Sequence, residues 1–108
     1  MELDSVLLSG FNELEEIDMK AVNSVLIEYL KKMKRHRDFK QLNIYIKKHI
    51  KGKVELFEIK ANVRARKKLS SSADGFNPYK TLAEVLENLI KELEHEHTKN
   101  VRGNVRTL

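Results

Sequence analysis

The spacing of hydrophobic positions changes along the chain, and each change predicts a different element. The run "SVLLSGF" is apolar up to Gly10 and predicts a first strand of about five residues. From Met19 onward the apolar residues recur at intervals of three and four, which predicts an amphipathic helix of about four turns with Asp18 as its N-cap. Its predicted last turn, "KKMKRHR", is strongly basic, and cations there favour the negative end of the helix dipole.

In the middle of the chain apolar and polar residues alternate with a period of two, which predicts strands that have one apolar face each. The first of these runs from Gln41 to about Lys51, and Gly52 permits the positive φ of a tight hairpin turn. A second alternating segment covers residues 57–64. A turn at 65–67 then leads into "KKLSSSAD", which predicts one more strand of the same sheet.

The third part of the chain predicts a second amphipathic helix. Asn77 can cap its free amides, and Pro78 fits the first helical position because its missing N–H is not needed there. The apolar stripe of this helix consists of Leu82, Val85, Leu86, Leu89, Ile90 and Leu93. Residues 98–108 show no period, so they are predicted to form a flexible C-terminal tail.

These elements predict an α+β fold of order β-α-β-β-β-α in which residues 1–97 form a single domain. Two amphipathic helices and a sheet with one apolar face bury one another only if both helices pack on the same face of the four-stranded sheet. The other face is then open to solvent. It should display Asn43, Tyr45, Lys47, Lys60, Asn62 and Arg64.

Composition agrees with one small cytoplasmic domain. Of the 108 residues, 41% are apolar and 34% are charged, and there is no cysteine. The absence of cysteine removes disulfides and thiolate metal sites and is consistent with a reducing compartment. No apolar run approaches the roughly 18 residues that a membrane span needs, and the first residues are acidic where a signal peptide is basic. We therefore expect no membrane association.

Charge is distributed unevenly along the chain. Residues 1–30 contain one basic and seven acidic residues, whereas residues 31–68 contain fifteen basic and three acidic residues. Residues 69–108 are nearly balanced, with five basic and six acidic residues. A middle third this positive suggests a polyanionic partner such as nucleic acid, and the alternative is an ordinary solvated charged surface.

The sequence contains no constellation that indicates catalysis. The run "SSS" at 70–72 lacks the glycine context of a nucleophile elbow, and Gly52 with Lys53 lacks the preceding glycine of a phosphate-binding loop. His95 and His97 are two positions apart, so on a helix they point in nearly opposite directions and cannot chelate one metal ion. We expect no enzyme, cofactor, metal site or small-molecule substrate.

The order of elements, together with "FEIKANVRARKKLSSSADGFNPYKTLAEVLENLIKELEHEH", resembles the ribosome hibernation promoting factor family, also called ribosome-associated inhibitor A or sigma-54 modulation proteins. The helix entry of that family has its counterpart in Asn77, Pro78 and Tyr79. The segments "VLLSGF" and "LNIYIKKH" match in order and length, so the resemblance covers roughly residues 3 to 97. The chain corresponds to the short members, which lack the additional carboxy-terminal domain.

The resemblance implies a hibernation factor that inhibits translation. Such proteins bind the decoding region of the small ribosomal subunit, block messenger and transfer RNA sites, and contact ribosomal RNA phosphates through basic residues. Carried onto this chain, and with Lys60 of the open face added, the expected RNA-binding residues are Lys31, Lys32, Lys34, Arg35, Arg37, Lys47, Lys48, Lys60, Arg64, Arg66, Lys67 and Lys68.

One departure from the family pattern and two alternative functions remain. The second helix of the family usually ends in a basic stretch, whereas this chain has "KELEHEHTK", which puts contacts from Glu94 and Glu96 in doubt. A double-stranded RNA-binding module shares the helix, three strands, helix order, although the first strand argues against it. A protein-interaction adaptor for an acidic partner would also use a basic sheet face or edge.

Overall fold

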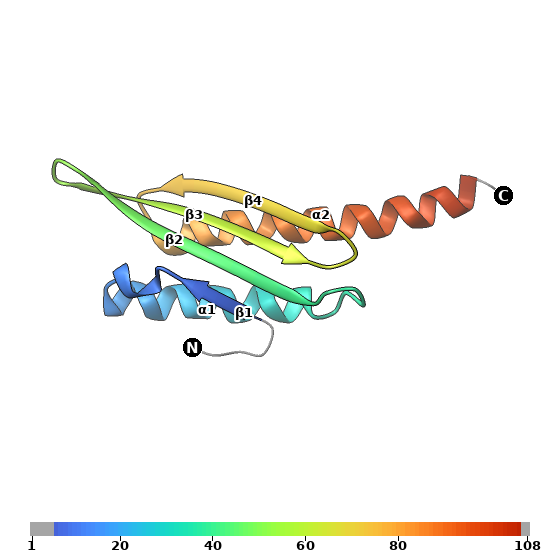
Figure 1. Cartoon of the computed structure of the whole chain (residues 1–108), viewed down its shortest axis with the longest axis horizontal. Coiled ribbons are helices and arrows are strands. Elements are labelled where there is room, and N and C mark those ends of the chain that lie inside the picture. Colours follow the sequence, from blue (N-terminus) through green and yellow to red (C-terminus); the bar gives the residue numbers. More distant parts are fainter. Residues whose placement is uncertain (1–5, 107–108) are drawn as a thin grey trace.

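The four predicted strands form one sheet, and two helices cover one of its faces (Figure 1). The structure, a computed structural model, describes the backbone of residues 6–106 and the side chains of residues 6–95. The elements in chain order are β1 (Val6–Ser9), the short 3-10 helix η1 (Phe11–Glu13), α1 (Glu16–Met33), β2 (Gln41–Lys51), β3 (Val54–Arg64), β4 (Lys68–Gly75) and α2 (Pro78–Arg106). This order confirms the predicted β-α-β-β-β-α fold.

The strands lie in the sheet in the same order as in the chain, β1-β2-β3-β4. β1 pairs with β2 in parallel, because α1 carries the chain back across the sheet between them. The other two pairings are antiparallel hairpins. Lys51 pairs with Val54 across a two-residue turn in which Gly52 has a φ of 63°, as the sequence predicts.

The core lies between the sheet and the two helices, because the apolar face of every long strand points toward them. On β2 and β3, inward residues face each other across the ladder, for example Leu42 opposite Val63 and Ile44 opposite Ala61. All six residues of the predicted α2 stripe are buried. From α1 the core receives the buried side chains of Val22, Leu26, Leu30 and Met33.

The start of α2 agrees with the sequence prediction. The Asn77 side-chain oxygen accepts hydrogen bonds from the N–H groups of Tyr79 and Lys80, at 3.1 and 3.2 Å. The Thr81 hydroxyl donates to the Asn77 carbonyl oxygen at 2.7 Å. Asn77 therefore satisfies two of the amides that a helix start leaves free and fixes the direction in which α2 leaves the sheet.

Both predicted ends of α1 are wrong. The helix begins at Glu16, so Asp18 lies inside its first turn and does not cap it, although its carboxylate still favours the positive end of the helix dipole. The helix ends at Met33, the last residue of its buried stripe. The rest of "KKMKRHR" forms a series of turns, in which the His36 N–H donates to the Met33 carbonyl oxygen at 3.0 Å.

The second helix is longer than predicted. Its backbone is helical to Arg106, although the sequence predicts a tail from residue 98, and Figure 1 shows it continuing past the end of the sheet. Once a helix is formed, each further residue adds a hydrogen bond at little cost, so an apolar stripe is not required for it to continue. Residues 107–108 lie outside the described part, and the domain boundary at residue 97 stays a prediction.

Candidate nucleic-acid interface

The face of the sheet that the helices leave open carries the polar residues that strand alternation predicts. Asn43, Tyr45 and Lys47 on β2 lie opposite Asn62, Lys60 and Glu58 on β3. Leu7 and Ser9 of β1 continue these rows on one side, and Ser70 and Ser72 of β4 continue them on the other. We call this surface the open face. Among its basic residues, Lys47, Lys60, Arg64 and Lys68 are exposed.

The centre of the open face is neutral and polar. The Asn43 side-chain amide donates a hydrogen bond of 2.8 Å to the side-chain oxygen of Asn62 directly opposite. The Asn43 side-chain oxygen is buried and has no hydrogen-bond partner. The amide and hydroxyl side chains of this face can donate and accept hydrogen bonds, so the face is suited to a polar partner.

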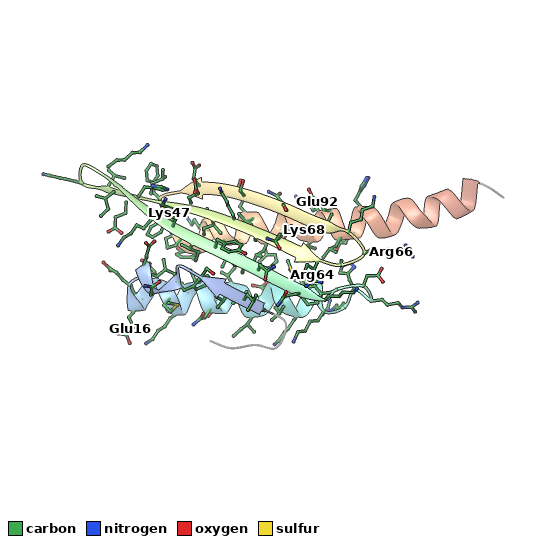
Figure 2. The ribbon with its side chains drawn as sticks, in the orientation of Figure 1. Glu16, Lys47, Arg64, Arg66, Lys68 and Glu92 are labelled. Atoms are coloured by element: carbon green, nitrogen blue, oxygen red, sulfur yellow. The ribbon has the colours of Figure 1, made fainter. Side chains whose placement is uncertain are left out.

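One end of the molecule gathers basic residues from two segments that are far apart in the sequence. The loop after α1 lies against the turn between β3 and β4, because the Lys40 N–H donates to the Arg64 carbonyl oxygen at 2.8 Å. Arg66 Nε lies 3.9 Å from Asp38 Oδ2. We call this region the basic end. It contains the predicted residues Lys34, Arg35, Arg37, Arg64, Arg66, Lys67 and Lys68, and Figure 2 shows Arg64, Arg66 and Lys68 there.

This arrangement produces a strong local excess of positive charge. Asp38 is the acidic residue of the connecting loop 34–40, and its ion pair with Arg66 is exposed on both sides. Exposed pairs of this kind contribute little to stability, so the guanidinium of Arg66 is available to exchange this partner for another anion. The basic end therefore has the charge, exposure and placement to bind phosphate groups.

Four of the other predicted residues lie outside the basic end. Lys47 and Lys60 are on the open face, and Lys47 has Glu58 as its partner across the strands. Lys31 and Lys32 occupy the last turn of α1, which is in the helix layer. The Lys32 ammonium lies 4.8 Å from the centre of the Tyr29 ring, a cation–π contact within the helix.

Lys48 is separated from the other predicted residues. It follows Lys47 on β2, so its side chain points to the opposite face, the one that the helices cover. There its ammonium forms an ion pair of 3.6 Å with Glu55, and its backbone N–H donates to the Glu13 carboxylate at 2.8 Å. The structure thus does not bring Lys48 to the open face or to the basic end.

Two residues that are not in the predicted RNA-binding set belong to this surface. Lys40 is exposed and directly precedes β2, where its backbone joins the two segments of the basic end. Tyr45 is 48% exposed on the open face. Lys40 follows the basic run after one acid and one aromatic residue, so extending that run to the start of the strand would have included it.

The described residues contain neither a cluster of metal ligands nor a helix that could span a membrane. No group of three or more His, Asp or Glu side chains lies close enough together to hold a metal ion within residues 6–95. The helices of the described part are too short or too polar to cross a lipid bilayer. The side chain of Glu96, one of the two acids that depart from the family pattern, lies outside the described residues, whereas Glu94 is exposed.

Comparison with known structures finds two proteins that share this fold. A ribosomal subunit interface protein from Coxiella burnetii superposes with a TM-score of 0.57 at 18% identity, over 87% of this chain and 98% of that chain. The N-terminal domain of Thermus thermophilus Protein Y superposes with a TM-score of 0.53 at 16% identity, over 86% of this chain and 98% of the other.

At these identities the likeness establishes a shared fold. No protein-family model matches the sequence, and none of the curated protein sequences matches it significantly. The structures therefore confirm, at the level of fold, the resemblance to the ribosome hibernation promoting factor family that the sequence indicates.

Proposed function

We propose that this protein is a ribosome hibernation factor that binds the small ribosomal subunit through ribosomal RNA phosphates. The observation that carries the proposal is the basic end, which the fold assembles from the loop 34–40 and the turn 65–67. The shared fold with a ribosomal subunit interface protein supports the choice of partner. In this role the protein acts in the cytoplasm.

Binding in this proposal is driven by electrostatics. Cations that neutralise RNA phosphates release condensed counterions, so affinity falls steeply as salt rises. About six phosphate contacts would lower the affinity on the order of a thousandfold for a fourfold increase in salt. The exposed basic residues of the basic end are sufficient in number for such contacts.

Inhibition then requires no chemistry on the ribosome. A folded domain held in the decoding region excludes messenger and transfer RNA by occupying their space, and it leaves when ionic conditions or competing ligands reverse the binding. The acidic residues Glu92 and Glu94 make α2 an unsuitable RNA contact. We therefore propose that the basic end and the open face, rather than α2, meet the RNA.

A titration against three RNA partners tests the proposal. Labelled protein is added to purified small subunits, to purified large subunits and to duplex RNA that matches the length of a ribosomal helix. The proposal predicts tightest binding to small subunits. Equal or tighter binding to the duplex would instead indicate a double-stranded RNA-binding module, and binding to none of the three would favour an adaptor for an acidic protein.

A further inference from the structure

The open face presents the ring of one tyrosine, Tyr45, to solvent. The described strands contain one tyrosine and one phenylalanine, Tyr45 and Phe57, and Phe57 is buried in the core. Tyr45 is about half exposed, and its neighbours across the sheet are Ser9 on one side and Lys60 on the other. No bulky apolar residue stands beside it in this row, so the ring has no apolar partner there.

Two shallow depressions meet at Tyr45. The first has a volume of about 440 Å³ and is lined by short polar side chains, among them Asn62, Ser70 and Ser72, together with Lys60. The second has a volume of about 330 Å³ and contains the basic residues of the β3 to β4 turn. Its lining includes Asn43, Asn62, Arg64, Arg66, Lys67 and Lys68. Tyr45 thus lines both a mainly polar hollow with one cation, Lys60, and a strongly basic one with four cations.

The charge of the open face changes from acidic to basic along strands β3 and β4. The two acidic side chains of the β3 and β4 rows, Glu58 and Asp74, lie opposite each other toward the far hairpin. Arg64 and Lys68 lie opposite each other at the other end of the same ladder. A polyanion on this face would therefore lie over the half that runs from Tyr45 to the basic end.

We propose that the open face binds an unpaired stretch of RNA, with one base stacked on the Tyr45 ring and adjoining phosphates held by Arg64 and Lys68. The inference rests on the proposed function, which supplies RNA as the partner. Stacking needs an exposed ring and a base that is free of its helix, and every base has a π face, so such contacts tolerate many sequences.

The polar residues around the ring fit this occupant better than a protein segment. Asparagine side chains carry both a donor and an acceptor for the edge of a base, and Asn43 and Asn62 both line the hollow beside the ring. Phosphates alone would need only the cations. An acidic peptide would also use the cations, but it would gain little from an aromatic ring among serines and asparagines.

The test compares RNA with and without bases on variants of Tyr45. The probes are a single-stranded RNA of about ten nucleotides, an abasic chain of the same length and charge, and a polyglutamate peptide. Wild-type protein should bind the base-bearing RNA about fivefold to a hundredfold more tightly than the abasic chain. Tyr45→Thr, which keeps a strand-forming residue but loses the ring, should remove this difference. Tyr45→Phe should retain it.

Controls separate stacking from folding and from charge. Tyr79→Ala removes an exposed tyrosine from α2 instead of the sheet and should leave the preference for bases intact. Thermal melting should show that every variant is folded at the assay temperature. Tyr45→Thr should also leave the salt dependence unchanged, because it removes no cation.

The outcomes distinguish this inference from the proposed function. Small-subunit binding that is equal in wild type and Tyr45→Thr, or equal affinity for abasic and base-bearing chains, overturns the stacking inference and leaves the proposed function standing. Polyglutamate binding that depends on Tyr45 overturns it as well. Absence of small-subunit binding in the wild type overturns the proposed function. In that case the comparison of base-bearing with abasic RNA still shows whether a base stacks on Tyr45.

Discussion

At the residue scale, two glycines with positive φ differ in what surrounds them. Gly10 has a φ of 81° and follows β1, where a Cβ atom would collide with the backbone carbonyl oxygen of Ile46 on β2. Gly52 has a φ of 63° in the hairpin turn, where a Cβ atom would meet open space. The sequence alone predicts a turn at Gly52 and the end of a strand at Gly10, and it does not show that only Gly10 lies close to another strand.

Substitution by alanine should reveal this difference. Gly52→Ala should cost about 1 to 2 kcal/mol, the penalty of a left-handed backbone for a residue with a side chain. Gly10→Ala should cost roughly 3 kcal/mol or more, because β1 must also move away from β2. Urea denaturation of the two variants measures both values. Equal losses of stability would show that Gly10 has no close contact with β2.

Tyr29 of α1 interacts with Glu87 of α2, and ionisation of its phenol makes the stability of the protein depend on pH in the alkaline range. Burial, then a hydrogen bond and charge repulsion from Glu87, and repulsion from Glu28 raise the pKa of Tyr29 above its ordinary value of 10.0. The folded state therefore holds this proton more tightly than the unfolded state. The stabilisation is fully present below the unfolded pKa and is lost as pH rises through the folded pKa.

Removing the phenol group should remove this part of the pH dependence. Wild-type protein should lose more stability than Tyr29→Phe between about pH 9 and about pH 11. Chemical denaturation of both proteins across this pH range measures the difference, and the variant keeps an aromatic ring beneath Lys32. Parallel pH profiles would contradict the assigned direction of the pKa shift.

At the element scale, the entry of α2 depends on one asparagine. Asn77→Ala should lower the free energy of unfolding by about 1 kcal/mol, because two helix amides lose their acceptor. Asn77→Asp should retain most of the stability, since a carboxylate accepts the same bonds and favours the helix dipole. Denaturant unfolding of the two variants provides the check. An unchanged midpoint for Asn77→Ala would show that the cap contributes nothing.

The elements themselves could largely be predicted from the sequence because burial imposes its period on the chain. Alternation along residues 41–51 and 57–64 predicted which side chains face the helices, although β3 begins earlier, at Val54, and the Asn77 and Pro78 pair marked a helix start. The ends of α1 could not be predicted in this way. Asp18 is a good capping residue, but the buried positions from Val22 onward allow the helix to begin at Glu16.

The candidate site could be predicted only in part. The cations of 64–68 and of 34–37 were identifiable as charge clusters, but their meeting at one end depends on the pairing of Gln41 with Arg64, which is a property of the folded sheet. The position of Lys48 on the covered face follows from alternation with Lys47. Alternation applied to each cation in turn therefore separates Lys48 from the cations of the open face.

At the scale of the whole molecule, cations lie at both ends. Lys51 and Lys53 are exposed at the tip of the β2 to β3 hairpin, and Figure 1 shows this tip at the end opposite the β3 to β4 turn. The proposal assigns RNA binding to the cations of the basic end, and it does not predict that cations elsewhere on the protein contribute. The hairpin lysines therefore provide a matched control in the same protein.

Neutralising each end should have different effects on small-subunit binding. A variant with Arg64→Ala, Arg66→Ala, Lys67→Ala and Lys68→Ala should bind much more weakly, and a variant with Lys34→Ala, Arg35→Ala and Arg37→Ala should be weakened in the same direction. Lys51→Ala with Lys53→Ala should stay close to wild type. Cosedimentation at fixed salt measures all three. A stronger effect of the hairpin variant would assign the interface to the other end.

The most direct test is the slope of small-subunit affinity against salt concentration, measured for wild type and for the fourfold variant of the β3 to β4 turn. Each phosphate contact contributes roughly 0.7 to 0.9 to the slope of log affinity against log salt. We expect the slope of the variant to be shallower by about 3, with the hairpin double variant matching wild type. Equal slopes for all three proteins would contradict RNA binding through the basic end.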